Sequence, residues 1–263
     1  MQGESGIRES TPDKIKPMNQ ETLQFLLKLN RDFYNAYAQS FSSTRYSIQP
    51  GIRRLLPRLL NSENILDLGC GNGNLAQALI DAGFTGTYLG VDNSLSLIQD
   101  AKKAIPKHKA DQFSFRQLDL SAQLETLLNH SGFNAIACFA VIHHFPADAY
   151  LNRFFEFARQ NLAMSGKFYL STWQVKNNRR LSTRIQPWSL LEVDPKELSE
   201  DDLLLDWRAD PSMPPHYRYV RHYDSVALTT AGFSTDLILK DEFFSDGKEG
   251  DLALYQIWNK PTA

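Results

Sequence analysis

A glycine-rich turn at residues 65–74, Ile-Leu-Asp-Leu-Gly-Cys-Gly-Asn-Gly-Asn, is the feature that most constrains how this chain can fold. Apolar residues typical of a buried strand surround Asp67, and Gly69, Gly71 and Gly73 follow at alternate positions. A strand that runs into such a turn, and then into a helix, presents main-chain N–H groups with no Cβ in front of them. The segment therefore predicts a place where a nucleotide-like ligand approaches the backbone closely.

The spacing of these glycines separates two classes of ligand. In the dinucleotide fingerprint the third glycine comes five residues after the first, whereas here it comes four residues after, and Asn74 occupies the fifth place. This spacing resembles motif I of the Rossmann-like methyltransferases that depend on S-adenosylmethionine. It does not favour an NAD-dependent dehydrogenase. We therefore expect S-adenosylmethionine as the cofactor and S-adenosylhomocysteine as the product.

Strand and helix patterns alternate along most of the chain, which is typical of a parallel sheet with helices on both faces. We predict an α/β, Rossmann-like class I methyltransferase fold with a mainly parallel, seven-stranded sheet. The predicted strands cover residues 65–68, 87–91, 113–118, 134–142, 167–173, 236–244 and 252–258, and a long helix is expected at 146–162. Asp92, Asp119 and His144 follow three of these strands, at the edge where such sheets bind ligands.

Four segments describe the predicted domain organisation. Residues 1–19 are polar and are expected to form a flexible N-terminus, followed by one methyltransferase domain at 20–263. Within that domain, residues 20–60 read as N-terminal helices. Residues 174–222 interrupt the regular pattern, and we expect them to form a lid insertion that covers the mouth of the site.

Composition excludes several functional classes. The formal net charge is only −2, so no global charge indicates a nucleic-acid or membrane partner. Cys70 and Cys138 lie far apart and match no metal-ligand spacing, and we predict no metal site. No signal peptide and no apolar run of membrane-spanning length is found. We expect a cytoplasmic protein without a membrane partner.

Each polar residue at a strand end has a distinct expected role toward the cofactor. The Asp92 carboxylate can accept both ribose hydroxyls, and Asp119 can accept from the adenine amino group while the Leu120 N–H serves a ring nitrogen. Asp67 is expected to orient the loop or to meet the amino end of the cofactor. Any one of these acids alone reads equally well as a strand-end or helix-capping residue. The predicted cofactor site comprises Asp67, Gly69, Cys70, Gly71, Gly73, Asp92, Asn93, Ser94, Asp119, Leu120, Ala140 and His144.

Methyl transfer requires mainly in-line positioning of the acceptor. A carboxylate acceptor is ionised at neutral pH and needs no general base, whereas a hydroxyl or carbon acceptor requires one. His143 and His144 are the candidate catalytic bases, and since they are adjacent at most one of them is expected to face the pocket. A packing or capping role is the alternative for both.

Five segments resemble, in the same order, motifs of the eukaryotic tRNA wobble-uridine carboxymethyl methyltransferases. They are Phe-Ser-Ser-Thr-Arg at 41–45, Asp-Leu-Gly-Cys-Gly-Asn-Gly at 67–73, Ala-Val-Ile-His-His-Phe at 140–145, Leu-Leu-Leu-Asp-Trp at 203–207 and Arg-Tyr-Val-Arg-His-Tyr at 218–223. The family methylates the carboxylate of 5-carboxymethyluridine in the anticodon. The resemblance thus implies tRNA and a small activator subunit as partners.

The same resemblance implies further site residues. Arg45 and Tyr37 would reach the methionine end of the cofactor. Arg218, a tentative catalytic residue, would face the acceptor's carboxylate or the RNA backbone together with Arg221 and His222. The sequence departs from the family pattern at Gln49-Pro50, at Val220-Arg221, and in lacking an Asn-Trp pair near the last strand. These departures all fall on the acceptor side.

An acid-free run at residues 157–191 is the sequence feature that favours RNA binding. It contains Trp173, Trp188 and four basic residues between 176 and 184, which can follow phosphates. The acidic stretch at 192–210 offers the alternative of simple charge pairing. Trp173 is included among the predicted substrate-binding residues. Two other functions stay open: methylation of a small metabolite, and a non-catalytic S-adenosylmethionine-binding subunit or sensor.

Overall fold

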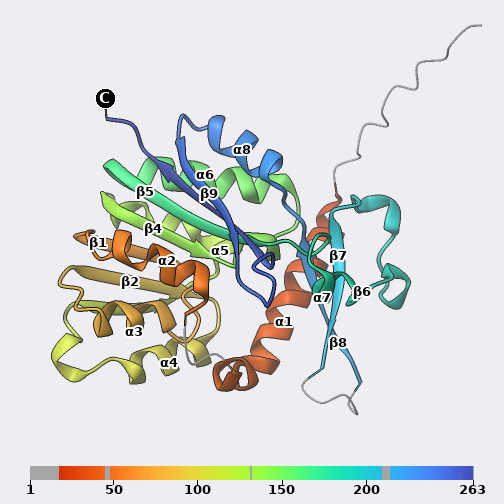
Figure 1. The fold of residues 1–263 in the computed structure, drawn as a ribbon. Coiled ribbons are helices and arrows are strands. Elements are labelled where there is room, and N and C mark those ends of the chain that lie inside the picture. Colours follow the sequence, from red (N-terminus) through yellow and green to blue (C-terminus); the bar gives the residue numbers. More distant parts are fainter. Residues whose placement is uncertain (1–17, 45–47, 131, 209–213, 263) are drawn as a thin grey trace, which may run out of the picture.

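Seven strands build one sheet in the order β3-β2-β1-β4-β5-β10-β9 (Figure 1). The structure is a computed structural model that describes residues 18–44, 48–130, 132–208 and 214–262. Only β10 runs antiparallel to its neighbours. The predicted fold class is therefore confirmed. The strands are β1 (Asn64–Leu68), β2 (Thr87–Asp92), β3 (Phe113–Gln117), β4 (Phe133–Phe139), β5 (Leu162–Trp173), β9 (Ile238–Ser245) and β10 (Ala253–Asn259).

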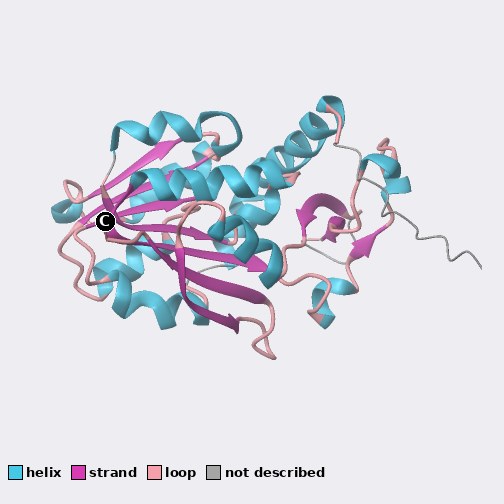
Figure 2. Ribbon diagram, turned by 90° about the horizontal axis from the view of Figure 1, so that it is seen from above, coloured by secondary structure: helices cyan, strands magenta, loops and turns pink. Residues whose placement is uncertain are grey.

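Helices cover both faces of this sheet (Figure 2). Side chains of α2 (Pro50–Leu59), α3 (Asn74–Asp81) and α4 (Leu95–Ala104) form the core on one face. The other face packs against α5 (Leu120–Gln123), α6 (Asp148–Asn161) and α8 (Ser225–Phe233). The strands feed both cores because successive side chains point to opposite faces: Ile65 lies in the first core, and Leu66 and Leu68 in the second.

The order of the strands reverses at β1, which lies between β2 and β4. Open α/β sheets bind ligands beyond the carboxyl ends of the strands at such a point. The glycine turn follows β1 directly, Asp92 ends β2, and Ala140 follows β4. The topology therefore brings three of the predicted site segments to one edge of the sheet.

At two of the element boundaries that differ from the predictions, a residue with positive φ accounts for the difference. The strand predicted at 134–142 ends at Phe139, since Ala140 has a φ of 56°. The helix predicted at 146–162 begins only at Asp148, since Ala147 has a φ of 69°. Neither conformation continues a strand or a helix, so the residues between them form a short irregular segment above the sheet.

A second, antiparallel sheet lies within residues 174–222, where no strand was predicted. It consists of β6 (Ile185–Gln186), β7 (Asp202–Trp207) and β8 (His216–Arg221). The short helix α7 (Arg179–Ser182) precedes it. The long helix α1 (Gln20–Thr44) contacts both α4 and β8, and Figure 1 shows it between the two sheets. The second sheet thus stands beside the ligand edge of the main sheet.

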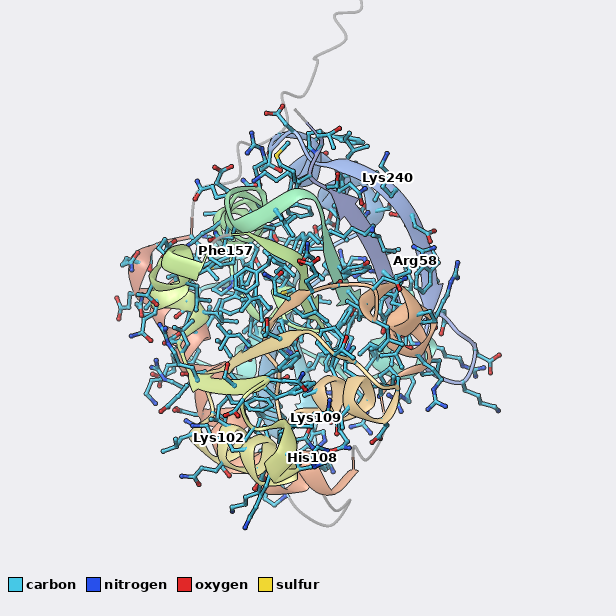
Figure 3. All side chains as sticks on the ribbon, turned by 90° about the vertical axis from the view of Figure 1, so that its left-hand side faces the viewer. Arg58, Lys102, His108, Lys109, Phe157 and Lys240 are labelled. Atoms are coloured by element: carbon cyan, nitrogen blue, oxygen red, sulfur yellow. The ribbon has the colours of Figure 1, made fainter. Side chains whose placement is uncertain are left out.

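Charged side chains are found toward both ends of the molecule. Figure 3 shows Lys102, His108 and Lys109 toward one end of the molecule and Arg58 and Lys240 toward the other. Arg58 of α2 forms an ion pair of 2.8 Å with Asp241 of β9, which ties this helix to the edge of the sheet. This distribution agrees with a net charge close to zero.

Candidate functional site

A cavity of about 250 Å³ opens at the carboxyl edge of the main sheet. Its wall is built from the ends of β1, β2 and β4, the first turns of α3 and α4, and one face of α1. The wall includes most of the predicted cofactor residues: Asp67, Gly69, Cys70, Gly71, Asp92, Asn93, Ser94, Asp119, Leu120, Ala140 and His144. The structure therefore brings together residues that lie up to 77 positions apart in the chain.

The glycine turn is held open by its own hydrogen bonds. The N–H groups of Gly69 and Cys70 both donate to the carbonyl oxygen of Val91, at 2.8 and 2.9 Å. Gly69 has a φ of 77°, and a Cβ at this position would lie 2.3 Å from the side chain of Val141. At Gly71, with a φ of 55°, the space that a Cβ would occupy is open to 4 Å. The turn thus needs glycine for packing at one position and leaves room for a ligand at the other.

Gly73 lies at the start of α3 and does not line the cavity. It caps the helix with a left-handed φ of 83°, and its N–H donates to the carbonyl oxygen of Cys70 at 3.1 Å. The Cys70 thiol is buried, and burial raises its pKa. Gly73 therefore shapes the turn from outside the cavity, whereas Cys70 also lines it.

Asp92 braces the glycine turn from the end of β2. One carboxylate oxygen accepts the Gly71 N–H and the other accepts the Ser94 N–H, both at 2.9 Å. Burial raises the pKa of this carboxyl, and the main-chain donors oppose that rise. Each carboxylate oxygen has a second lone pair, so the group retains acceptor capacity toward the cavity.

Asp119 and Leu120 lie at the start of α5, on the cavity wall. One Asp119 oxygen caps α5 by accepting the Ser121 N–H at 2.9 Å, and the other lies 3.7 Å from the guanidinium of Arg31 on α1. Asp119 therefore does cap a helix, which was the alternative role considered for this acid. The second oxygen and the neighbouring Leu120 remain at the cavity.

Asp67 lies beneath the turn and is only 3 % exposed. It accepts a hydrogen bond from the Tyr88 hydroxyl. Burial raises the pKa of Asp67 to about 7, the Tyr88 hydrogen bond opposes this rise, and the nearby Asp92 adds to it. A cationic group entering the cavity would favour the ionised form of this acid.

The two adjacent histidines point in different directions. His143 is fully buried, and its Nδ1 accepts the main-chain N–H of Trp173 at 3.3 Å. His144 lines the cavity, and its Nε2 lies 2.6 Å from the hydroxyl of Tyr34. As expected, only one of the two histidines lines the cavity. That residue is His144, whereas His143 is packed in the interior.

One face of α1 supplies cavity residues that the sequence reasoning missed. Tyr34 lies on the cavity wall together with Leu27, Asn30 and Arg31. The Asn30 amide donates to the carbonyl oxygens of His144 and Tyr219, at 2.8 and 3.0 Å, and its oxygen accepts the Tyr219 N–H at 2.8 Å. Asn30 was the sequence signal that could have identified this face of α1. It is a polar residue on an otherwise apolar helix face, and a buried amide needs hydrogen-bond partners.

Trp173 and Arg218 connect the cavity to the second sheet, although Arg218 does not itself line the cavity. Trp173 lines the cavity, and the Arg218 guanidinium carbon lies 4.5 Å from the centre of its ring. The guanidinium is also 5.2 Å from the ring of Phe33. Arg218 is only 7 % exposed, and burial lowers its pKa, opposed by the Tyr34 hydroxyl. A guanidinium nevertheless keeps its charge in a protein.

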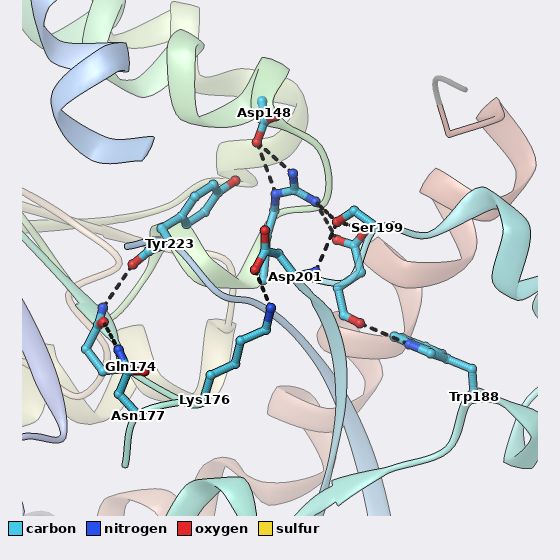
Figure 4. A network of polar contacts seen from close by, with 10 residues as sticks. Asp148, Gln174, Lys176, Asn177, Trp188, Ser199, Asp201 and Tyr223 are labelled. Carbon is cyan, nitrogen blue, oxygen red and sulfur yellow. Dashed lines mark hydrogen bonds and ion pairs between the residues drawn. The ribbon is translucent and has the colours of Figure 1, made fainter. Parts of the chain in front are cut away.

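Arg221 and His222 are placed away from the cavity wall. The Arg221 guanidinium pairs with Asp148 and Asp202, each at 2.8 Å, and donates to the Ser199 hydroxyl (Figure 4). His222 is 7 % exposed, and burial lowers its pKa. Arg221 anchors the second sheet to α6, and the contact of these two residues with the acceptor stays a prediction.

Tyr37 also lies outside the cavity wall. Its ring contacts Trp207 of β7 and His216 of β8, with centroid distances of 4.4 and 4.6 Å. The tyrosine of α1 that lines the cavity is Tyr34, one turn earlier on the same helix. Arg45, the other residue expected there, lies outside the described residues.

The described part of the chain contains no group of three or more His, Cys, Asp or Glu side chains able to hold a metal ion. In the same part, no helix combines the length and the hydropathy needed to span a bilayer.

Comparison with known proteins places this geometry in context. A family model described as a methyltransferase domain matches residues 59–202. The tRNA (carboxymethyluridine(34)-5-O)-methyltransferase ALKBH8 of Mus musculus is 28% identical over 170 residues, which cover 64% of this chain and 23% of that protein. The trans-aconitate 2-methyltransferase of Acidovorax ebreus (strain TPSY) is 36% identical over 77 residues, or 28% of this chain and 29% of that protein. The matches thus span less than a third of either relative's length.

Solved structures share the fold at lower identity. The magnesium protoporphyrin IX methyltransferase ChlM of Synechocystis PCC 6803, with bound SAH, has a TM-score of 0.61 at 13% identity, covering 88% of this chain and 97% of that one. A methyltransferase in complex with the Haloferax volcanii Trm112 activator has a TM-score of 0.59 at 15% identity, covering 89% and 98%. At these identities the solved structures show that the fold is shared, and they show nothing beyond the fold.

Proposed function

Because this chain belongs to the methyltransferase-domain family and is an S-adenosylmethionine-dependent methyltransferase, we propose that it esterifies a carboxylate, namely the carboxymethyl group of a wobble uridine in tRNA. Bound in the cavity, the cofactor would supply a methyl group on a positively charged sulfur. The residues of the cavity must then hold the cofactor, orient the acceptor oxygen and exclude water.

Residues at three strand ends would hold the cofactor. The open space beside Gly71 fits the close approach of a ligand to the backbone. Asp92 would accept the ribose hydroxyls on its remaining lone pairs while it keeps the turn in place. Asp119 and Leu120 would meet the adenine ring at the far wall.

Arg218 carries the proposal of a carboxylate acceptor. Its Nε has no hydrogen-bond partner, and its guanidinium has no carboxylate within ion-pair distance, among the residues that the structure describes. A buried arginine without an anion is costly, and a carboxylate is the group that a guanidinium binds most specifically. An acceptor carboxylate next to Trp173 would complete this ion pair.

Tyr34 and His144, which adjoin Arg218 and Trp173, support the same acceptor. The hydrogen bond between the Tyr34 hydroxyl and Nε2 of His144, 2.6 Å long, fixes the imidazole ring against which the acceptor would lie. An ionised carboxylate needs no proton removed before it attacks. The role of His144 in this scheme is therefore to orient the acceptor, and that of Tyr34 is to hold His144 in place.

The name of the mouse relative supports tRNA as the source of the carboxylate, and the likeness to the Trm112-bound methyltransferase supports a small activator subunit as a partner. Trans-aconitate 2-methyltransferase, by its name, acts on a small acid, and its match favours a second candidate function, the methylation of a small carboxylic acid. Both functions use the same cofactor site and the same Arg218 contact.

One labelling experiment separates these candidates. The protein, with and without an activator subunit, is incubated with methyl-labelled S-adenosylmethionine and one of three acceptors: tRNA carrying 5-carboxymethyluridine, the same tRNA with uridine, or a mixture of small di- and tricarboxylic acids. We expect alkali-labile label in the first tRNA alone. Label confined to the small acids would establish the second candidate, and absence of label despite cofactor binding would contradict both.

An arginine variant tests the acceptor contact itself. Arg218→Gln should lower kcat/KM for the carboxylate acceptor by at least tenfold, the scale of a lost charge-assisted hydrogen bond, with cofactor affinity unchanged. Arg159→Gln on α6 serves as the matched control. Equal rates for both variants would remove Arg218 from the acceptor site.

A further inference from the structure

We propose that four aromatic side chains beside the cavity form a stacking surface for an unpaired RNA base adjacent to the methylated nucleotide. The aromatic strip consists of Phe33 and Tyr37 on α1, Trp207 on β7 and His216 on β8. The proposal rests on the proposed function, because it assumes that the carboxylate arrives on RNA.

The four rings are in direct contact with one another. Phe33 contacts Tyr37 and Trp207 with centroid distances of 5.3 and 5.8 Å. Tyr37 contacts Trp207 at 4.4 Å and His216 at 4.6 Å. Trp207 and His216 are paired across the antiparallel β7–β8 ladder, so both side chains point to the same face of the second sheet, the face toward α1.

The aromatic strip runs from the cavity to the surface. At its inner end, Phe33 is 4 % exposed and contacts the Arg218 guanidinium, which in turn lies over Trp173 on the cavity wall. At its outer end, Tyr37 and Trp207 are half-buried and His216 is exposed. An aromatic cluster that served only as core would be buried throughout, as Phe33 is.

The aromatic strip adjoins the cavity along α1. Tyr34 lines the cavity and Tyr37 belongs to the aromatic strip, and three residues of helix advance by about 4.5 Å. A base that stacks on the strip while its neighbour enters the cavity would therefore be splayed rather than paired. Recognition of RNA in single-stranded loops commonly works in this way, with bases stacked on aromatic rings.

Arginines lie near the end of β7 that carries Trp207. Arg184 and Arg208 lie 3.7 and 4.0 Å from the carboxylate of Asp206, which is shared between them. Arg180 and Arg184 are also close enough to Arg218 for their charges to lower its pKa. Two arginines thus share one carboxylate here, although the net charge of the chain is −2. Such a combination of basic groups and stacking rings is typical of single-stranded nucleic-acid sites.

Comparing two acceptors that share one carboxylate isolates the contribution of the aromatic strip. The acceptors are an anticodon stem-loop RNA carrying 5-carboxymethyluridine and the free nucleoside 5-carboxymethyluridine. In His216→Ala and Tyr37→Leu we expect kcat/KM for the RNA to fall about tenfold, the scale of one lost stacking contact. The nucleoside has no neighbouring base, so its kcat/KM should stay within twofold of the unmodified protein.

The control variant is Phe244→Ala, which removes an exposed aromatic ring from the edge strand β9. It should leave both rates unchanged. Cofactor affinity, measured by calorimetry for all variants, verifies that the main domain is intact, and agreement of the two strip variants guards against misfolding of either one.

The outcomes separate this inference from the proposed function. If the unmodified protein esterifies the RNA and the strip variants do so at the same rate, the stacking proposal is overturned. The proposed function is unaffected by that result. Equal losses on RNA and nucleoside would also overturn the stacking proposal and assign the rings to the packing of α1 against the second sheet. Unmodified protein that esterifies small acids but no RNA would overturn the tRNA function itself.

Discussion

The hydroxyl of Tyr34 lies 2.6 Å from Nε2 of His144, and both side chains line the cavity. The two residues come from α1 and from the segment after β4, 110 positions apart in the chain. Asn30 secures the same junction, since its amide donates to the carbonyl oxygen of His144 at 2.8 Å. Helix α1 therefore controls the orientation of the histidine that faces the proposed acceptor.

Tyr34→Phe tests this control. Loss of one hydrogen bond of about 1 kcal/mol should lower kcat/KM for the acceptor about fivefold and leave cofactor affinity unchanged. Steady-state kinetics and calorimetry measure the two effects separately. Tyr217→Phe, which alters a half-buried tyrosine of β8 outside the cavity wall, is the control and should change neither. A Tyr34→Phe protein with unaltered kinetics would contradict the orienting role.

Asp92→Ala should raise the dissociation constant for S-adenosylmethionine. The variant removes the acceptor of the Gly71 N–H and the proposed ribose contact together. Loss of charge-assisted hydrogen bonds of about 1–3 kcal/mol corresponds to roughly 5- to 150-fold weaker binding. Asp81→Ala, at the exposed end of α3, should bind normally in the same titration. Equal affinities of the two variants would refute the assignment of Asp92.

Asp67 should make stability fall as pH rises toward neutrality. Burial raises the pKa of Asp67 from 3.8 to about 7, so between these values the folded state holds a proton that the unfolded chain releases. The folded state is then favoured at low pH, and this contribution is lost as pH rises through about 7. The slope reaches at most about 1.4 kcal/mol of unfolding free energy per pH unit.

Asp67→Asn removes this titration while keeping an acceptor for the Tyr88 hydroxyl. Urea unfolding at pH 5 and at pH 7.5 should show the variant gaining stability relative to the unmodified protein at the higher pH. The exposed Asp81→Asn variant should show no such change. The difference in unfolding free energy between Asp67→Asn and the unmodified protein could instead be the same at both pH values. That result would show that the pKa of Asp67 is not raised in the folded state.

Arg221 pairs with two carboxylates whose environments differ, and the two pairs should differ in energy. Asp202 has a side-chain exposure of 2 % and Asp148 of 66 %. Asp148→Asn should reduce the unfolding free energy by less than about 1 kcal/mol, as for surface ion pairs. Asp202→Asn disrupts a buried pair and should cost about 3–5 kcal/mol. Urea unfolding measures both, and similar values for the two variants would show that Arg221 does not anchor the second sheet.

Local sequence was sufficient for the elements that carry the cofactor site. The glycines at 69, 71 and 73 require a turn after a strand, because side chains are disfavoured at their positive φ values. Alternation of strands and helices then implies a parallel sheet, and the carboxyl ends of parallel strands meet at one edge. For that reason Asp92, Asp119 and His144 were predicted on the same side of the sheet, and the structure places them there.

The acceptor side depended on relations that no local pattern contains. Which of two adjacent histidines faces the cavity is decided by the positive φ of Ala140 and by packing against Trp173. Whether Tyr34 or Tyr37 reaches the cavity depends on the rotation of α1 about its axis. Arg218 and Arg221 are three residues apart on β8 and therefore point to opposite faces of the second sheet.

The sequence by itself thus determined the class of fold and the segments available to bind the cofactor, because strand, turn and helix propensities are local. Tertiary structure decided which side chains meet at the acceptor end. Only there do α1, the segment after β4 and the second sheet come together, and the cross-strand register leaves Arg218 buried beside Trp173 while Arg221 pairs with Asp148 and Asp202.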